Sequence, residues 1–370
     1  MRIAQIGPLT EAIPPKLYGG TERVISWLTE ELVAMGQDVT LFASGDSHTS
    51  AKLEPVWPRA LRLDGTVRDG NALHMAMLER IYERAREFDV LHFHLDYYPF
   101  SLFSRQDTPF VTTLHGRLDL PEHQVVFKSF PRAPLISISN NQRRPIADAP
   151  WLTTIYHGMP QGLLMPQPMK PEYLAFMGRI APEKAVDQAI EIAGRCGLPL
   201  KIAAKVDPVD RNYFAEEIKP LLSRRGVEFI GEIGDEDKSA FLSGAMALLV
   251  PMAWNEPFGL VMIEAMACGT PVLAFRCGSV AEVIEDGLTG AIVDTMDEAI
   301  AALPHVIALD RKKVRQRFEQ RFSATRMAED YVGVYCALLA SSRSLDSKEG
   351  IAQHSLQNGK NAITLRSQIA

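Results

Sequence analysis

Short apolar segments alternate with helix-like patterns along most of the 370 residues, and the same alternation starts a second time in the middle of the chain. In the first half, the segments that we expect to be strands lie at residues 2–7, 38–44, 89–94, 109–115 and 134–139, and apolar residues at helical spacing predict a helix over 20–35. Consecutive strands that are separated by helices need crossover connections. The sequence therefore predicts an α/β fold whose sheet is mainly parallel.

The second half repeats this order of elements. Strands are expected at 173–179, 200–205, 227–231, 247–251, 271–275 and 290–294, and helices at 183–196, 211–223, 235–245 and 257–267. Helical patterns continue after Pro304 to about residue 339. We expect two Rossmann-like lobes that face each other across a cleft, with ligands bound beyond the carboxyl ends of the strands.

The stretch 158–171 contains four prolines and two glycines, which makes it the best candidate for the connection between the lobes. We expect an N-terminal domain over 1–160 and a C-terminal domain over 161–322. A last helix over 323–340 is expected to pack back toward the N-terminal domain. Residues 341–370 are rich in Ser, Gln and Asn and have few aromatics, so we expect them to be disordered.

The charge balance and the cysteines exclude several classes of protein. The formal net charge is −6, from 39 basic and 45 acidic residues, which argues against a nucleic-acid binder. The 4 cysteines are widely spaced and form no metal-ligand pattern, as in proteins that stay reduced in the cytoplasm. The N-terminal apolar run is too short for a signal peptide, and no segment approaches the roughly 20 apolar residues of a membrane span. We expect a cytoplasmic protein, and peripheral contact with the inner face of a membrane stays open.

The most specific segment of the chain is 254–271. A predicted strand ends at Pro251, and Pro257 suits the first turn of the helix that follows. Three backbone N–H groups then fall in that first turn, those of Phe258, Gly259 and Leu260. Unpaired donors and the helix dipole at such a position favour an anionic or hydroxylated ligand.

Two carboxylates belong to the same segment. Glu256 lies just before the predicted helix, where it can accept hydrogen bonds from sugar hydroxyls, and Glu264 lies about two turns inside it. No cation occurs within a turn of Glu264, so a buried carboxylate there needs a hydroxyl donor. A capped surface helix with two incidental acids is the alternative interpretation.

Glu256 and Glu264 form an E-x7-E pattern, and the strings EPFGL, EAMA and GTP stand in register around it. This segment resembles the retaining glycosyltransferases of family 4, which have the GT-B fold. In that family the first acid contacts the donor sugar and the second holds the ribose of the nucleotide. The resemblance covers about residues 1–340, and it implies an acceptor-side N-terminal domain and a C-terminal domain that binds the nucleotide-sugar donor.

A second segment agrees with the resemblance. Residues 178–184 read GRIAPEK, follow a predicted strand, and place Arg179 and Lys184 five residues apart at the edge of the cleft. A diphosphate suits this pair, because Arg binds it as a fork and Lys as a point charge. The family usually has glycine after this lysine, whereas Ala185 stands here. We expect little cost from that alanine if the backbone there is helical.

The N-terminal half contributes Gly19 and Gly20, which lie between the first strand and the first helix. In the family, a glycine loop at this place faces the phosphates. The pair is not a G-x-G-x-x-G fingerprint, which weakens a dehydrogenase interpretation. His115 ends a predicted strand at the cleft, and the resemblance places it near the transferred sugar. His92 and His94 share one face of the preceding strand, and are either structural or on the acceptor side.

The strand at 227–231 ends where relatives hold the nucleobase through backbone groups, which points to Gly231 and Ile233 as donor-binding residues. The following string, 235–237, reads DED and matches a D-x-D metal pattern. Acids at the start of a helix are explained by the helix dipole, so we reject the metal interpretation. No metal is expected, and no cofactor either, since the nucleotide sugar is a substrate.

The resemblance implies a retaining hexosyltransferase that moves a hexose from a UDP- or GDP-linked donor to a sugar, lipid or small-molecule acceptor by same-face attack. The expected catalytic residues are His115, Arg179, Lys184 and Glu256. A nucleotide-sugar epimerase or a phosphorylase on the same fold is the alternative among enzymes. A sugar-nucleotide binding protein without turnover is the alternative from another class.

Overall fold

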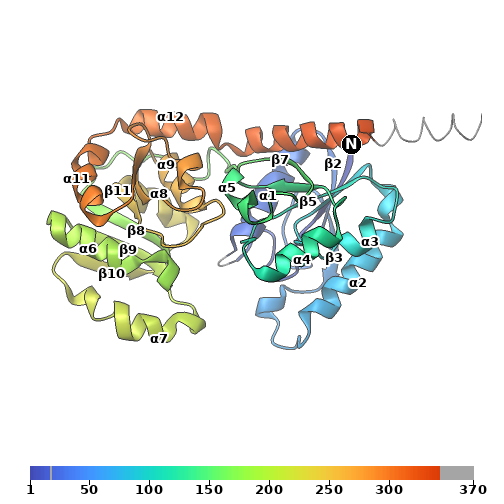
Figure 1. Ribbon diagram of the computed structural model, residues 1–370, viewed down its shortest axis with the longest axis horizontal. Helices are drawn as coiled ribbons and strands as arrows, with labels where there is room; N and C mark the ends of the chain where they lie inside the picture. The colour runs from blue at the N-terminus through green and yellow to red at the C-terminus, as the bar shows by residue number, and fades with distance from the viewer. Residues whose placement is uncertain (17–18, 342–370) are drawn as a thin grey trace, which may run out of the picture.

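The computed structural model of the chain describes residues 1–16 and 19–341, which form two lobes lying side by side (Figure 1). Of the tail predicted to be disordered, 341–370, residue 341 is the last of a helix, and residues 342–370 lie outside the described residues.

The N-terminal lobe, drawn from blue to green in Figure 1, contains one parallel sheet flanked by helices. Its elements are β1 (Arg2–Ile6), α1 (Gly20–Ala34), β2 (Asp38–Ser44), β3 (Lys52–Trp57), α2 (Gly70–Glu83), β4 (Val90–Phe93), α3 (Phe100–Phe103), β5 (Phe110–Thr113), α4 (Pro121–Ser129), β6 (Leu135–Ser137), α5 (Asn140–Arg143) and β7 (Trp151–Thr154). Within the described residues, the seven strands follow the order β3-β2-β1-β4-β5-β6-β7, and neighbouring strands pair in parallel.

The C-terminal lobe repeats this architecture. Its elements are β8 (Tyr173–Arg179), α6 (Val186–Cys196), β9 (Leu200–Lys205), α7 (Arg211–Tyr213), β10 (Val227–Gly231), α8 (Asp235–Ser243), β11 (Ala245–Val250), α9 (Leu260–Ala267), β12 (Val272–Phe275), α10 (Val280–Val283), β13 (Gly290–Val293), α11 (Met296–Ile307) and α12 (Arg311–Arg321). In this part of the described chain, six parallel strands follow the order β10-β9-β8-β11-β12-β13. The predicted α/β class with mainly parallel sheets is confirmed.

The strands that the sequence pattern does not predict, β3 and β7, are the two edges of the first sheet. Neither is deeply buried, and β3 contains Pro55, which an edge strand tolerates because one side of its backbone needs no partner. Strands of this kind lack the apolar run that marks a buried strand.

Two predicted helices have different limits in the structure. The helical pattern expected only after Pro304 begins earlier, because Pro304 lies inside α11. The helix expected over 211–223 is broken into α7, a π-helical turn at Phe214–Ile218 and a 3₁₀ turn at Leu221–Ser223, with Pro220 between the last two. Proline lacks the N–H that would continue the helix.

The two connections between the lobes run beside each other. Met159, at the start of the proline-rich connection, exchanges backbone hydrogen bonds with the segment after α12: its N–H donates to Phe322 O at 2.9 Å, and its O accepts from Ala324 N at 2.9 Å. A Cβ on Gly158 would lie 2.2 Å from Ser323 O, so the close approach requires glycine. Any change in the angle between the lobes therefore acts on both connections at once.

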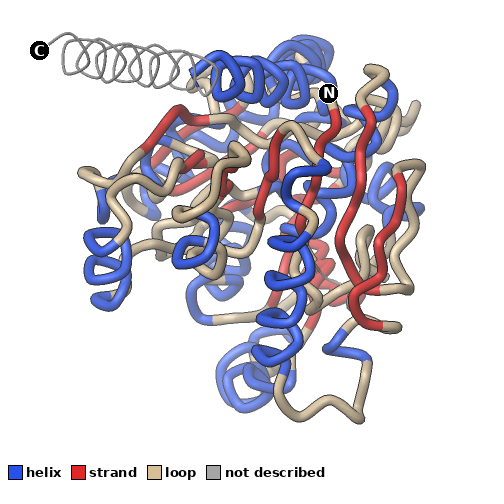
Figure 2. Tube along the Cα trace, turned by 90° about the vertical axis from the view of Figure 1, so that its right-hand side faces the viewer, coloured by secondary structure: helices blue, strands red, loops and turns tan. Residues whose placement is uncertain are grey.

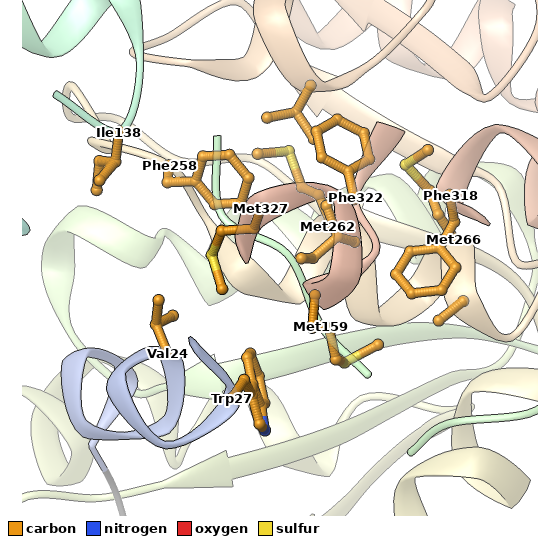
Figure 3. Packing of buried hydrophobic residues seen from close by; sticks show 14 of the residues in the cluster. Val24, Trp27, Ile138, Met159, Phe258, Met262, Met266, Phe318, Phe322 and Met327 are labelled. Atoms are coloured by element: carbon orange, nitrogen blue, oxygen red, sulfur yellow. The ribbon is translucent and has the colours of Figure 1, made fainter. Parts of the chain in front are cut away.

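One hydrophobic cluster extends across the junction of the lobes (Figure 3). Val24 and Trp27 reach it from α1, Met159 from the connection, Met262 from α9 and Phe318 from α12. Ile138 and Phe258 belong both to this cluster and to the lining of the cavity described below.

The chain returns to the N-terminal lobe through a helix over residues 324–341, which runs along the top of the molecule in Figure 1 and lies near the N-terminus in Figure 2. Tyr331 and Tyr335 project from it and are 1% and 0% exposed. Their hydroxyls contact Thr113 at 3.0 Å and Gln5 at 3.1 Å, so the helix packs against the N-terminal lobe through buried polar contacts. Across the described residues, none of the helices is both long enough and apolar enough to cross a membrane.

Candidate active site

A cavity of about 880 Å³ lies between the lobes, at the carboxyl ends of the strands. Its lining brings together nearly all of the site residues expected from the sequence, namely Gly19, Gly20, His115, Arg179, Lys184, Ile233, Glu256, Phe258, Gly259, Leu260 and Glu264. Gly231 ends β10 and is not among the lining residues, whereas Glu232, Ile233 and Gly234 are.

Lys184 and Glu256 form an ion pair that joins the two motif segments at one point of the cavity. Trp254, which the sequence analysis did not single out, donates from its indole Nε1 to Glu256 Oε2 at 3.0 Å, and Lys184 Nζ lies 5.4 Å from the centroid of its ring. A positive charge over an indole face is attracted by the ring quadrupole. The carboxylate and the ammonium are therefore oriented by the same indole ring.

Glu264 has a cationic partner that the sequence pattern did not reveal. Lys238 of α8 places Nζ 2.7 Å from Glu264 Oε1 and 3.1 Å from Asp235 Oδ1, and Asp235 also pairs with Arg23 of α1. Burial lowers the pKa of Lys238, but the charges of Glu264 and Asp235 outweigh it and raise the pKa above its usual value. Glu264 is also the fifth residue of α9, about one turn inside, because the helix starts later than predicted.

The chain Glu264–Lys238–Asp235–Arg23 crosses from one lobe to the other, since Arg23 belongs to the N-terminal lobe. Burial raises the pKa of Asp235, but Lys238 and Arg23 reverse that effect and leave the pKa below its usual value. The helix dipole explains why the acids of the DED string lie at the start of α8. Asp235 has a second role, because it forms an ion pair with Arg23 of the other lobe.

Arg179 lies at the end of β8 with carboxylates around its guanidinium. It pairs with Glu183, and its nitrogens lie 3.7 Å from Asp207 Oδ2 and 3.6 Å from Asp210 Oδ2. Lys205 pairs with Asp207 at 2.9 Å as well. Arg179 lines the cavity, and the three carboxylates around its guanidinium restrict the position of that group.

Ala185 does not have the helical backbone under which its cost would be small. Its φ and ψ are 51° and 49°, the left-handed conformation, and it separates the 3₁₀ turn Pro182–Lys184 from α6. An L-residue pays about 1–2 kcal/mol for this conformation, whereas glycine does not. The condition under which a small cost was expected is therefore not met, and a glycine at this position would have a conformational reason.

The helix of the E-x7-E segment begins at Leu260 rather than at Pro257, because Gly259 precedes it with φ 80°. Phe258 and Gly259 therefore lie before the first turn, and the unpaired donors of this helix start with Leu260. Gly259 would meet Met262 Cε at 2.7 Å if it had a Cβ. The prediction that all three N–H groups belong to the first turn was wrong, although all three residues line the cavity.

Gly19 and Gly20 lie at the start of α1, opposite α9. A Cβ on Gly20 would lie 3.6 Å from Leu260 Cδ1, so the starts of the two helices lie close together, and both line the cavity. Two helix N-termini that converge on one space, together with Lys184, favour a ligand with several negative charges.

The N-terminal lobe lines the cavity with a histidine wall made of His115 and His157, which stack with ring centroids 5.3 Å apart. Behind it, His94 Nδ1 lies 2.8 Å from His115 Nε2. Burial lowers the pKa of His115 to about 3 and takes the pKa values of His94 and His157 well below the usual value. All three rings are therefore neutral at physiological pH.

His157 was not expected in the site, and no local pattern around it signals such a role. It follows β7 by three residues and packs edge to face against Phe258, at 4.9 Å between ring centroids. His92 is also structural in its contacts, because its two ring nitrogens lie 2.7 Å from Tyr335 OH and 2.8 Å from Thr113 Oγ1, away from the cavity.

The two lobes match two known sequence families, one for each lobe. Residues 165–322 match the family described as Glycosyl transferases group 1, and residues 18–157 match the one described as Glycosyltransferase Family 4. The chain is a GT-B glycosyltransferase.

Known glycosyltransferases are similar to this chain over most of its length. It is 26% identical over 351 residues to a phosphatidyl-myo-inositol mannosyltransferase of Mycobacterium leprae, a match that covers 86% of this chain and 90% of that protein. Among solved structures, it is similar to AviGT4, a glycosyltransferase involved in avilamycin A biosynthesis, with a TM-score of 0.67, 26% identity, and coverage of 92% of this chain and 98% of that one. Sucrose-phosphate synthase from Thermosynechococcus elongatus shares the fold, with a TM-score of 0.75, 21% identity, and coverage of 92% and 99%.

A second cavity of this glycosyltransferase, about 520 Å³, opens between the lobes on the other side of Trp254. Arg117 and Asp119 line it from the N-terminal lobe, and Glu183, Trp254 and Asn255 from the C-terminal lobe. Arg117 pairs with Asp119 at 2.6 Å, and its guanidinium carbon lies 6.0 Å from the centroid of the Trp254 ring. Trp254 therefore separates this opening from the Lys184–Glu256 pair.

Within the described ranges 1–16 and 19–341, no three His, Cys, Asp or Glu side chains are grouped as a metal site would need.

Proposed function

We propose that this glycosyltransferase moves a hexose from a nucleoside diphosphate sugar to an acceptor, with retention of the anomeric configuration and without a metal ion. The observation that carries the proposal is the pairing of each E-x7-E carboxylate with a lysine at the same cavity, Glu256 with Lys184 and Glu264 with Lys238. Sugar and ribose hydroxyls suit the carboxylates, and phosphate oxygens suit the cations. A nucleotide sugar offers both kinds of group along one molecule.

Departure of the nucleoside diphosphate builds negative charge on the leaving phosphate. Lys184, Arg179 and the N-terminus of α9 all line the cavity, and we assign to them the stabilisation of that charge. Positioned donors in a cleft that excludes water stabilise such charge better than water does. The loss of one of these groups is expected to lower the rate by about 10²- to 10³-fold.

Retention through a covalent glycosyl-enzyme needs a carboxylate on the face of the sugar opposite the leaving group. On the N-terminal wall, the described lining residues are Pro14, Pro15, Lys16, Gly19, Gly20, Thr21, Arg23, His115, Ile138 and His157, and none of them is an acid. This supports same-face attack, in which the acceptor hydroxyl attacks beside the departing phosphate and transfers its proton to that phosphate.

The cavity beyond Trp254 suits the acceptor. Its guanidinium, carboxylate and amide offer a sugar hydrogen-bonding partners, and the indole of Trp254 adds an aromatic group beside them. A sugar held there lies next to the Lys184–Glu256 pair, where the donor hexose is expected. We propose a sugar as the acceptor, or as the accepting part of a larger acceptor.

The test is a transfer assay with UDP-glucose, UDP-galactose and GDP-mannose, each with a panel of monosaccharides and alkyl glycosides and with EDTA present. The proposal is supported if release of the nucleoside diphosphate depends on an acceptor and the product keeps the α-linkage of the donor. The anomeric configuration of the product is read from its NMR coupling constants. An inverted linkage, or a requirement for added divalent metal, contradicts it. Interconversion of donors without acceptor favours an epimerase, and donor synthesis or breakdown that consumes inorganic phosphate favours a phosphorylase.

A further inference from the structure

A line of buried hydrogen bonds runs from the cavity to the C-terminal helix. His115 Nε2 lies 2.8 Å from His94 Nδ1, His94 Nε2 lies 2.9 Å from Gln5 Oε1, and Gln5 Nε2 donates to Tyr335 OH at 3.1 Å. Gln5, His94 and His115 lie on or just after β1, β4 and β5, which are neighbours in the sheet. Gln5 and Tyr335 are 0% exposed and His94 is 4% exposed, so water does not compete for these contacts.

The proton positions along this line follow from the chemistry of its members. An amide oxygen only accepts, so the proton between Gln5 and His94 is on His94 Nε2. His94 is neutral because burial lowers its pKa well below the usual value, and a neutral imidazole has one N–H, so His94 Nδ1 is an acceptor. The proton between the two rings then belongs to His115 Nε2. His115 is neutral as well, which leaves its Nδ1 unprotonated.

His115 Nδ1 is buried and has no hydrogen-bond partner among the residues that the structure describes. The ring lines the cavity, and its other nitrogen is occupied by His94. A buried lone pair without a partner in the ligand-free protein is a place where a ligand hydroxyl gains a hydrogen bond.

The C-terminal helix completes the line on the other side of the Gln5 amide. Tyr335 OH accepts from Gln5 Nε2 and lies 2.7 Å from His92 Nδ1, to which it can donate. His92 Nε2 then donates to Thr113 Oγ1 at 2.8 Å. With the amide turned over, every proton in the line would shift to the other side, and His115 would present an N–H at Nδ1 instead of a lone pair.

We propose that Gln5 and His94 are positioning residues that hold His115 in the tautomer protonated at Nε2, so that its unprotonated Nδ1 accepts a hydrogen bond from a hydroxyl of the bound sugar. Tyr335 anchors this line from the C-terminal helix. His115 then contacts the sugar and does not donate to the phosphate oxygens, which only accept. The sugar contact rests on the proposed function, whereas the tautomer does not.

The tautomer is measured directly on the full chain with ¹⁵N-labelled histidine, from long-range ¹⁵N–¹H correlations at neutral pH. The spectrum of His115→Gln identifies the His115 signals among those of the 9 histidines. We expect a proton on Nε2 and none on Nδ1 in the ligand-free protein. A proton on Nδ1, or a mixture of both tautomers, overturns the proposal whether or not the protein transfers sugar.

The sugar contact is tested by the same spectrum with UDP against UDP-glucose and with GDP against GDP-mannose. We expect the Nδ1 resonance to shift with the sugar nucleotide of the pair that binds, and not with its free nucleotide. Equal shifts with both members of that pair overturn the contact with a sugar hydroxyl. If neither pair binds, both the proposed donor and the proposed contact between His115 and its sugar are wrong. The measurement of the His115 tautomer does not depend on that outcome.

The positioning role is tested with Gln5→Met, which removes the acceptor of His94. We expect a mixture of tautomers at His115, a several-fold loss in kcat/KM for the donor and unchanged affinity for the free nucleotide. Gln142→Met is the matched control, because this buried glutamine donates to the backbone oxygens of Leu114 and Gly116, on either side of His115, and has no contact with its ring nitrogens. The control is expected to keep the Nε2 tautomer. If Gln5→Met keeps it too, Gln5 does not position His115; if Gln5→Met does not fold, His94→Met replaces it with the same expectation.

Discussion

The two walls of the cleft hold their polar groups in opposite ways. The C-terminal wall carries charges in pairs, Lys184 with Glu256 and Lys238 with Glu264, each cation beside a carboxylate. The N-terminal wall also has two cations, Lys16 and Arg23, but what distinguishes it is a pair of neutral rings, His115 and His157, whose burial lowers their pKa values. A charged ligand is therefore expected to gain its binding energy at one wall, and a neutral sugar to be oriented by the other.

This difference divides the work of transfer. Stabilisation of a leaving diphosphate needs full charges at fixed positions, which the C-terminal wall provides. Orientation of a sugar needs hydrogen bonds of a defined direction, and a neutral imidazole adds one such bond to those that the Glu256 carboxylate can accept. Substitutions on the two walls should accordingly differ in which kinetic quantity they change.

The largest effect is expected on the charged wall. Lys184→Met removes a cation next to the leaving phosphate, and kcat/KM is expected to fall by about 10²- to 10³-fold in a transfer assay. Lys170→Met, which removes the same charge from an exposed position, is the control and should leave the rate unchanged. Equal rates for Lys184→Met and the native protein would remove the charged wall from the mechanism.

The neutral wall predicts a dependence of stability on pH. Among the described residues, burial lowers the pKa values of five histidines below the ordinary 6.5, namely His74, His92, His94, His115 and His157. The unfolded chain takes up protons below about pH 6.5 that the native protein does not, so the free energy of unfolding falls as pH decreases through this range. With the pKa of His115 at about 3, that residue alone is expected to cost about 2 kcal/mol at pH 5.

Urea unfolding between pH 7.5 and 5 measures this slope. His157→Phe should reduce it by about 1.4 kcal/mol per pH unit, the equivalent of one proton. His48→Gln, at an exposed histidine, should leave it unchanged. A native protein whose stability is flat over this range would mean that the histidine wall is not neutral.

The opening beyond Trp254 predicts a separate, smaller effect. Asp119→Ala removes a carboxylate from this cavity, and the KM of the acceptor found in the transfer assay should rise about tenfold, as expected for the loss of about 1.4 kcal/mol. Nucleotide affinity should not change, because Asp119 lies outside the main cavity. Asp107→Ala, with a side chain 94% exposed, is the control. A change in nucleotide affinity with no change in acceptor KM would place the acceptor elsewhere.

The smallest effect concerns Ala185. Ala185→Gly relieves the strain of the left-handed backbone, but it also removes the contacts of a methyl group and makes the unfolded chain more flexible. Because these effects oppose each other, the free energy of unfolding should stay within about 1 kcal/mol of the native value. Ala185→Val, with a β-branched residue at φ 51°, should be destabilised by about 2 kcal/mol. Urea unfolding compares the two, and equal stabilities would contradict the left-handed backbone.

The sequence could predict the charged wall better than the neutral one, for a physical reason. Arg179 with Lys184, and Glu256 with Glu264, each lie within one short segment, so local spacing carries the signal. The partner of Glu264 escaped prediction because Lys238 lies 26 residues away on another helix. The neutral wall depends on contacts such as Gln5 with Tyr335, which are 330 residues apart and leave no local pattern.

Most of the fold was predictable because buried parallel strands are apolar runs between turns. The edge strands β3 and β7 are one exception, because their outer sides need no apolar pattern. The left-handed conformation of Ala185 is another, because residues other than glycine usually adopt a right-handed backbone.

The account depends most on the claim that the charged wall binds a nucleoside diphosphate without metal. Calorimetric titration with UDP, GDP and ADP, each with and without EDTA, tests it most directly, with Glu264→Gln as the site variant. We predict that one nucleotide binds in preference to the others, equally with and without EDTA, and that Glu264→Gln weakens its binding. No binding of any nucleotide, binding abolished by EDTA, or unchanged binding to Glu264→Gln would contradict the account.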